Sequence, residues 1–264
     1  SYQSGGRKGM PLGRALGRCR DAVVLPPRPA RYERAMTRLV KHALPYSPLI
    51  EMTDHNGHLF VDATRTGRLF GPPPDVAWRI RKAVRTDMGF DPVWSVAPNK
   101  LIAKVATRMV KPAGEYVIGA GEEQDFLKPV PVHLIPGIER EDLKRFREFN
   151  LTRAGHVANL SMEQLNIMFG TRSGSLYHAV RGMDPSPVLP VGQTPPVVVA
   201  DHEFATDTNP VEMLQGALYG LAERAGANLR KRRLTARRIK VLLDYSDGRR
   251  IIRQAVANPA TAND

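Results

Sequence analysis

The sequence has almost no cysteine, few aromatic residues, and too few acidic residues to balance its basic ones. Cys19 is its single cysteine, which excludes an internal disulfide and a zinc site built on cysteine ligands. No apolar run approaches the length of a membrane span, and the opening residues SYQSGGRKG lack the apolar stretch of a signal peptide. We therefore expect a cytoplasmic protein.

The shortage of acidic residues leaves a net charge of +13 and a pI near 10.2. An excess of this size usually serves a polyanionic partner, although an Arg-rich proteome would also produce it. The 264 residues suffice for two or three domains, and a hydrophobic fraction of 42% is ordinary for a globular protein. No P-loop, nucleophile elbow, zinc-protease motif or dinucleotide fingerprint is present.

The stretch from Ser47 to Gly114 predicts the centre of the fold. Apolar runs at Leu49-Ile50 and Leu59–Ala63 flank turn residues and indicate a β-hairpin. A strand at Val93–Ala97 then leads into a helix at Pro98-Asn99. The basic residues of this helix recur every fourth position, on one face: Lys100, Lys104 and Arg108. A strand followed by a lysine-rich helix start favours phosphate binding.

Other segments predict an α+β fold, with helices packed on one side of a sheet. Short strands are expected at Ala22–Leu25 and Tyr116–Ile118. Helices are expected at Met10–Arg20, at Arg31–Ala43, and at Val76–Thr86 with Asp75 as N-cap.

From Leu134 the sequence predicts short helices. Ile135-Pro136-Gly137-Ile138 and the following helix, Glu141–Phe149, resemble a helix-hairpin-helix turn, in which a glycine lets backbone N–H groups approach a phosphate. Gly137 and Arg140 are the expected DNA contacts there. Glu139 stands where a second glycine is usual, and a plain turn would show the same Pro-Gly pair.

The proline-rich segment Pro185–Pro196 predicts a semi-rigid linker. A βαββ pattern follows it, with strands at Val197–Phe204, Ala236–Tyr245 and Arg249–Val256 and a helix at Pro210–Ala225. Between Arg224 and Arg253 there are eleven Lys or Arg residues and two Asp residues. This favours a basic face that follows a phosphate backbone, although a solvated charged face is the alternative. The expected DNA contacts are Arg230, Lys231, Arg232, Arg233, Arg237, Arg238 and Lys240.

Nearly the whole chain resembles the Y-family (translesion) DNA polymerases. The residues that carry the resemblance are GMPLGRALGRCRDAVVLPPRPARYERAMTRLV, YSPLIEMTDHNGHLFVDAT, SVAPNKLIAKVATRMVKPAG and VHLIPGI. They are similar to the end of the fingers, the palm hairpin, the palm segment that holds the triphosphate, and the thumb turn. The resemblance implies partial fingers (1–30), a palm (31–130), a helical thumb (131–184), a linker (185–196) and an incomplete βαββ little finger (197–264). It also implies a chain that is cut at both ends.

The resemblance implies a nucleotide site that is only partly kept. Lys100 matches the triphosphate lysine and Tyr2 matches a tyrosine of the fingers, while Gly5 replaces its arginine partner and Arg7 is a substitute. The family's catalytic Asp-Glu pair, counted back from Asp62, falls on Gly57 and His58. Neither can hold Mg²⁺ as a carboxylate does, and Asp54 in the lengthened turn is a weak substitute.

These departures make the chain similar to the ImuB-type subunits of bacterial mutagenesis cassettes. Those are polymerase-like proteins of DNA repair and the SOS response that bridge a replicative-type polymerase and the sliding clamp. The resemblance implies a non-catalytic, nucleoid-associated protein that binds primer-template or damaged DNA without a metal cofactor. One alternative is an active error-prone polymerase that uses Mg²⁺, with a further aspartate from a missing N-terminal segment. Another is a generic basic nucleic-acid-binding module.

Overall fold

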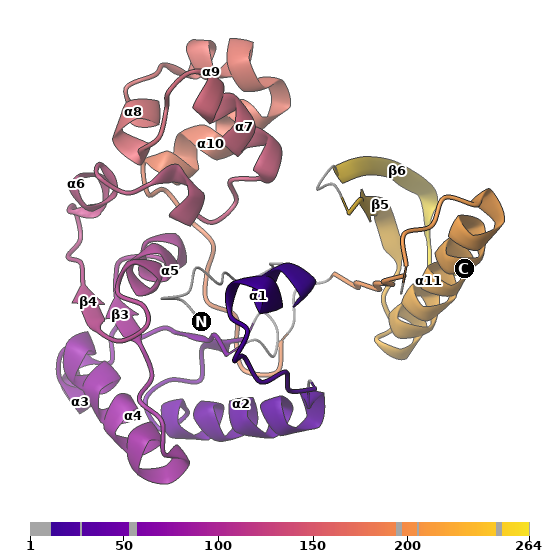
Figure 1. The fold of residues 1–264 in the computed structure, drawn as a ribbon. Coiled ribbons are helices and arrows are strands. Elements are labelled where there is room, and N and C mark those ends of the chain that lie inside the picture. Colours follow the sequence, from indigo (N-terminus) through magenta and orange to yellow (C-terminus); the bar gives the residue numbers. More distant parts are fainter. Residues whose placement is uncertain are drawn as a thin grey trace. The chain divides into compact units, whose positions relative to one another are not determined.

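The structure is a computed structural model that describes residues 12–26, 28–52, 57–193, 197–204, 206–246 and 250–263. The chain forms two compact units, Ser1–Gln193 and Thr194–Asp264 (Figure 1). The boundary between them falls inside the segment predicted as a linker. The finer division into fingers, palm, thumb and little finger stays a prediction. Among the described residues, no helix is both long and apolar enough to cross a bilayer.

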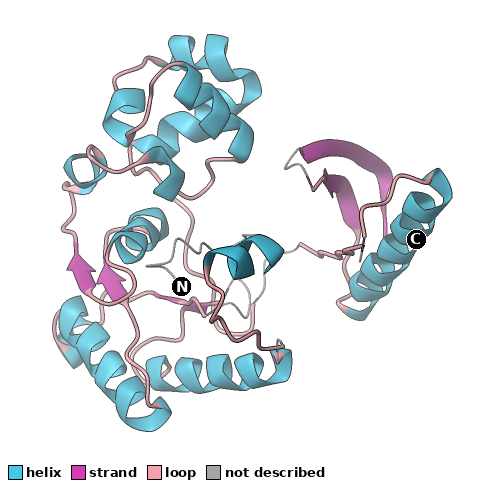
Figure 2. Ribbon diagram, viewed as in Figure 1, coloured by secondary structure: helices cyan, strands magenta, loops and turns pink. Residues whose placement is uncertain are grey.

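The first half of the larger unit mixes helices with very short strands (Figure 2). Its elements are α1 (Leu12–Arg18), α2 (Pro29–Ala43), β1 (Ile50–Glu51), β2 (Phe60–Val61), α3 (Gly67–Phe70), α4 (Pro73–Met88), β3 (Trp94–Val96), α5 (Lys100–Met109) and β4 (Glu115–Val117). The predicted hairpin is confirmed, because β1 and β2 pair antiparallel with Ile50 opposite Val61. The predicted strand before α5 is also confirmed, and it pairs in parallel with β4.

These strands do not form the single sheet that was predicted. Within the described residues, β1 and β2 make one two-stranded sheet and β3 and β4 make another. Ala22–Leu25 is not a strand either, and Val23 and Leu25 are about four-fifths exposed. A short β-rich run has no regular structure without a neighbouring strand to supply hydrogen bonds. The turn at Thr53–Asn56, including Asp54, lies outside the described residues, as do Tyr2, Gly5 and Arg7.

Helices α2 and α4 lie side by side (Figure 1), and both pack against the hairpin of β1 and β2. Val40 and Ala43 of α2 and Ile50 of β1 are buried together, and Ile80 of α4 packs against them. Both helices begin at a proline, which is favourable where the first N–H groups have no partner inside the helix. The predicted cap at Asp75 is wrong, because Pro72 is the N-cap and Asp75 lies in the first turn.

The second half of the larger unit is a cluster of short helices. They are α6 (Glu123–Leu127), the 3₁₀ turn η1 (Val132–Leu134), α7 (Arg140–Glu148), α8 (Ala154–Ala158), α9 (Met162–Phe169), the 3₁₀ turn η2 (Gly170–Arg172) and α10 (Ser173–Val180). The predicted helix at Glu141–Phe149 is therefore confirmed as α7. The main core runs without interruption from α5 into this cluster: Ile102 and Val105 of α5 belong to the same buried group as Phe146 and Leu176.

The smaller unit consists of α11 (Val211–Lys231), β5 (Ala236–Asp244) and β6 (Arg250–Thr261), with β5 and β6 antiparallel. The predicted helix and hairpin are confirmed, and the helix extends six residues beyond Ala225. The strand predicted at Val197–Phe204 does not form. Two carbonyls of this segment accept hydrogen bonds from arginine side chains of α11 and its end, instead of from a strand. Gly226 is the one described residue of this unit that is buried.

Candidate functional site

The site begins where β3 passes into α5. Asn99 is the N-cap of α5, and its Oδ1 accepts a hydrogen bond from the N–H of Ile102 at 3.0 Å. Its Nδ2 donates to the carbonyl of Gly182 at 2.8 Å, which fixes the end of the helical cluster beside the cap. Ser95 of β3 also donates from Oγ to the carbonyl of Ala103. These bonds place Lys100 at the first position of α5, as the sequence predicts.

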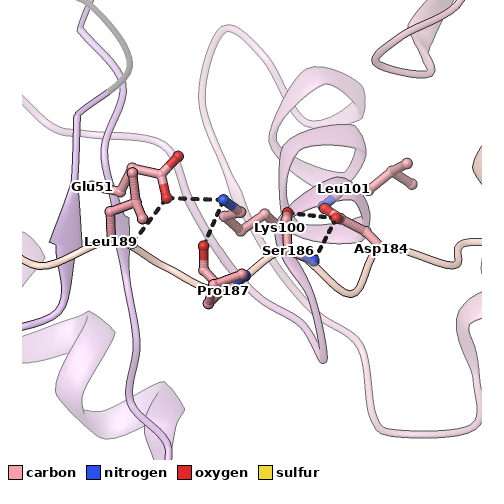
Figure 3. Close-up of polar contacts among 7 residues, drawn as sticks. All are labelled: Glu51, Lys100, Leu101, Asp184, Ser186, Pro187 and Leu189. Atoms are coloured by element: carbon pink, nitrogen blue, oxygen red, sulfur yellow. Dashed lines mark hydrogen bonds and ion pairs between the residues drawn. The ribbon is translucent and has the colours of Figure 1, made fainter. Parts of the chain in front are cut away.

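Lys100 is held inside the larger unit by an ion pair. Its Nζ lies 2.8 Å from Oε2 of Glu51 on β1 and 2.8 Å from the carbonyl oxygen of Pro187 (Figure 3). Only 16% of the Lys100 side chain and 6% of the Glu51 side chain are exposed, so water screens the pair little. Glu51 was not among the site residues predicted from the sequence. The available signal was a carboxylate directly after the apolar run that ends at Ile50.

A second carboxylate lies at the start of α5. Oδ2 of Asp184 accepts a hydrogen bond from the backbone N–H of Leu101 at 3.1 Å (Figure 3). Its Oδ1 accepts from the N–H of Ser186 at 3.0 Å and from the hydroxyl of the same residue at 2.5 Å. The positive end of a helix attracts anions. Here the anion is supplied by the chain itself.

The three basic residues on the face of α5 have different surroundings. Lys104 lies with Nζ 5.8 Å from the centre of the Phe60 ring. Arg108 donates from Nη1 to the carbonyl of Leu134 at 2.7 Å, and burial lowers the pKa of its guanidinium. Arg108 therefore joins α5 to the helical cluster. Of the three, Lys100 and Lys104 line the groove beside this helix.

This groove lies within the larger unit and has a volume of about 1130 Å³. It is bordered by α2, β2, α4, β3, the start of α5, and the segment from Asp184 to Val188. Its described lining combines apolar residues such as Met36 and Ile80 with charged ones, including Lys100 and Asp62. Gly57 and His58 also line it, just before β2. The groove brings together the positions that the resemblance assigns to phosphate and to the catalytic pair.

The described residues do not fit a two-metal carboxylate site. Gly57 has a φ of +87°, a backbone conformation that favours glycine over an acidic residue. Oδ1 of Asp62 accepts from the N–H of Thr64 at 2.7 Å, and Glu51 is paired with Lys100. Across the part of the chain that the structure describes, no three His, Cys, Asp or Glu side chains come together to hold a metal ion.

The predicted helix-hairpin-helix turn carries acidic residues at its following helix. Gly137 has a φ of +83° and open space where a side chain would project. Glu139 is the N-cap of α7 and forms a reciprocal capping box with Asp142. Arg172 donates to the carbonyl of Gly137 and to Asp142, both at 2.6 Å, and its hydrogen bond to Asp142 raises the pKa of Arg172. Arg140, the predicted DNA contact, is the first residue of α7.

The predicted basic residues of the smaller unit divide into two groups. Arg230 donates to the carbonyl of Ala262 at 2.8 Å, and Arg232 to that of Val197 at 2.9 Å. These two hold the ends of the unit against α11. The side chains of Lys231 and Arg233 are exposed and make no hydrogen bond or ion pair within the described residues.

Strand β5 presents the remaining three predicted contacts. Arg237, Arg238 and Lys240 are all exposed. Lys240 lies opposite Gln254 and Arg238 opposite Val256, so Arg238 and Lys240 share one face of the hairpin. Lys231 and Arg233 precede this strand directly. These five side chains are exposed and form the part of the smaller unit's predicted DNA-binding set that makes no hydrogen bond or ion pair within the described residues.

Family comparisons match both units. A model of the impB/mucB/samB family matches residues 1–108, and a model of that family's C-terminal domain matches residues 195–264. DNA polymerase IV of Desulfatibacillum aliphaticivorans is 30% identical over 99% of this chain and 66% of its own length. DNA polymerase IV of Caulobacter vibrioides is 30% identical over 89% of this chain and 58% of its own length. The chain thus spans up to about two thirds of these relatives.

Solved structures share the fold. The crystal structure of DinB from Sulfolobus solfataricus superposes with a TM-score of 0.64 at 21% identity, over 97% of this chain and 74% of that one. A chimera of the Y-family DNA polymerases Dbh and Dpo4 gives 0.67 at 19% identity, over 97% and 73%. The predicted α+β polymerase-like fold is confirmed by this likeness. The two family models, which together cover more than half of the chain, and the relatives at 30% identity show that it belongs to the impB/mucB/samB family of Y-family DNA polymerases.

Proposed function

We propose that the chain is a DNA-binding, polymerase-like protein of DNA damage tolerance that does not itself polymerise. The observation that carries the proposal is the pair Gly57 and His58 just before β2, at the positions to which the resemblance assigns the family's acidic pair. Two-metal phosphoryl transfer needs carboxylates that bind the cations and offset the charge of the triphosphate. The described residues do not fit a pair of Mg²⁺ ions.

The DNA side of the proposal rests on charge and on relatives. Lys231, Arg233, Arg237, Arg238 and Lys240 give the smaller unit a basic surface whose affinity for phosphates would depend on salt. One of the solved structures with this fold is an insertion ternary complex of Dbh DNA polymerase. We propose that this chain also binds primer-template or damaged DNA, with Gly137 and Arg140 as further contacts. The capping carboxylates beside Gly137 make that second contact the weaker of the two.

We assign the chain to the ImuB-type subunits, because it combines a retained polymerase scaffold with substituted acidic positions. The proposal includes a replicative-type polymerase and the sliding clamp as partners, and a location at the nucleoid. Lys100 remains the residue proposed to bind a triphosphate. The proposal also includes Tyr2 and Arg7 in that site; both lie outside the described residues.

The second candidate function is active translesion synthesis. The names of the relatives, DNA polymerase IV at 30% identity, favour it. In this case Asp54, together with an aspartate from a further N-terminal segment, would stand in for the pair.

Primer extension with Mg²⁺ or Mn²⁺ separates the two functions. We expect no templated extension by the full-length gene product under conditions in which a DNA polymerase IV extends the same primer. Extension that disappears in the Asp54→Ala variant would overturn the non-catalytic proposal. A second assay, competition binding at fixed salt, should show a preference for a primer-template junction over plain duplex. Equal affinity for the two would indicate a generic basic nucleic-acid-binding module instead.

A further inference from the structure

A short segment of the chain crosses the start of α5 and is bonded there at several points. We define the strap as Asp184–Leu189. Pro187 accepts from Lys100, the N–H of Leu189 donates to Oε2 of Glu51 at 3.0 Å, and Asp184 accepts from Leu101 (Figure 3). The strap therefore contacts both β1 and α5. Its partners on α5 are Lys100 and the backbone N–H of Leu101, the donors that a bound phosphate group would occupy.

The charges in this cluster are already matched. Lys100 has three N–H donors, of which Glu51 and Pro187 accept two, while Oε2 of Glu51 accepts from both Lys100 and Leu189. Only 6% of the Glu51 side chain is exposed, so its charge depends on these two partners. The third N–H is left for a phosphate oxygen, but a phosphate chain there meets the negative charge of Glu51. Tight binding to Lys100 therefore favours separation of Lys100 from Glu51 or displacement of Pro187.

We propose that the strap is a latch that competes with a triphosphate for Lys100. Docking of the strap and binding of the triphosphate then oppose one another, and each weakens the other by the same factor. The proposal rests on the phosphate role of Lys100 within the proposed function. It adds that Glu51 and Asp184 are positioning residues, which hold the strap closed until a polyanion replaces them.

Triphosphate binding can be measured on the complete chain by calorimetry, with sodium tripolyphosphate in one arm and a deoxynucleoside triphosphate in the other. We expect Asp184→Asn and Glu51→Gln each to tighten tripolyphosphate binding about fivefold or more, the lower end of usual coupling strengths. Lys100→Ala should abolish binding. If only the nucleoside triphosphate binds, and with the same response to the variants, the latch stands and the ligand is a nucleotide.

Amide hydrogen exchange distinguishes a latch that opens on ligand binding from an ion pair that only stabilises the fold. In the unaltered chain, saturating tripolyphosphate should speed exchange at the N–H of Leu189, which Glu51 protects. The same ligand should have no effect on this amide in Lys100→Ala. Asp184→Asn serves as the second variant in case Glu51→Gln fails to fold, because Asp184 is less buried than Glu51.

Asp125→Asn is the matched control, since it removes one negative charge from α6 without touching the strap. If it tightened binding as much as Asp184→Asn, the effect would be one of net charge and the latch would be overturned. If neither ligand binds, or if binding leaves exchange at Leu189 unchanged, the latch is also overturned. Either result, with junction binding to DNA intact, would remove the latch and leave the DNA-binding, non-catalytic function standing. Absence of binding would in addition remove the proposed triphosphate role of Lys100.

Discussion

Arg172 is one side chain on which the arrangement of several helices depends. It bonds the carbonyl of Gly137 and the carboxylate of Asp142, and lies 3.4 Å from Glu139. The Asp142 side chain is only 6% exposed, so it cannot recover these bonds from water. The turn at Gly137, which is proposed to contact DNA, is therefore fixed by Arg172, 35 positions further along the chain.

We expect Arg172→Ala to lower the free energy of unfolding by about 1–3 kcal/mol, because it leaves the buried Asp142 carboxylate without its charged partner. Urea denaturation measures the change. Lys144→Ala is the control, since its ion pair with Glu141 is exposed on both sides and should change the same quantity by less than about 1 kcal/mol. Equal effects of the two substitutions would show that Arg172 has no special role.

Asp87 gives a prediction for the dependence of stability on pH. Hydrogen bonds from Arg38, and then from His42, lower the pKa of Asp87 below its ordinary value of 3.8. A carboxyl whose pKa is lower in the folded state stabilises the fold above the unfolded value, and this contribution disappears as the pH falls through the folded value. Asp87→Asn should therefore remove part of the loss of thermal stability that occurs below about pH 4.

Thermal unfolding midpoints at a series of pH values from neutral down to below the ordinary carboxyl pKa test this. Asp125→Asn is again the comparison, because Asp125 makes no ion pair within the described residues. The explanation fails if the profile of Asp87→Asn remains as steep as that of the unaltered chain. It also fails if Asp125→Asn flattens the profile equally.

At the scale of elements, α11 and the turn after it combine two kinds of arginine and lysine. Arg230 and Arg232 bond backbone carbonyls of their own unit, whereas Lys231 and Arg233 project from the same turn without partners among the described residues. The sequence alone predicted one role for all four. The structure separates a structural pair from an accessible pair.

We expect the double variant Lys231→Gln, Arg233→Gln to weaken DNA binding about equally for all sequences, with an unchanged thermal midpoint. The slope of log affinity against log salt should fall by about one for each phosphate that the variant no longer neutralises. The double variant Arg230→Gln, Arg232→Gln should in addition lower the thermal midpoint of the smaller unit. An unchanged salt slope in the first double variant would contradict the assignment of DNA binding to this turn.

Elements with a clear period or cap were predictable, and elements that depend on partners were not. Helices α2 and α5 follow from apolar spacing, and the hairpin of β1 and β2 from two short apolar runs. The strand at Val197–Phe204 failed because strand formation needs a neighbour, which a local pattern cannot reveal. Lys100 was found by resemblance, but its partner Glu51 lies 49 positions away and only tertiary packing joins the two.

At the scale of the whole molecule, the two units differ in how much apolar surface they bury. The larger unit contains both clusters of buried hydrophobic residues, whereas Gly226 is the buried residue among those described in the smaller one. Burial of apolar surface is the main source of stability, so the smaller unit should be the less stable.

We therefore expect two unfolding transitions in urea. Both tryptophans, Trp78 and Trp94, belong to the larger unit, so tryptophan fluorescence should report only the later transition. Far-UV circular dichroism should show an earlier loss of signal as well, from α11 and its hairpin. Coincident transitions by the two probes would mean that the units unfold as one.

The core shared by α5 and the helical cluster has a mechanical consequence. Ile102 and Val105 pack with Phe146 and Leu176 in one buried group, and close-packed interiors transmit displacement instead of absorbing it. The helix that carries Lys100 is thus fixed at its apolar side to α7 and α10. A ligand that displaces the first turn of α5 would therefore move α7 and α10 with it as one rigid body.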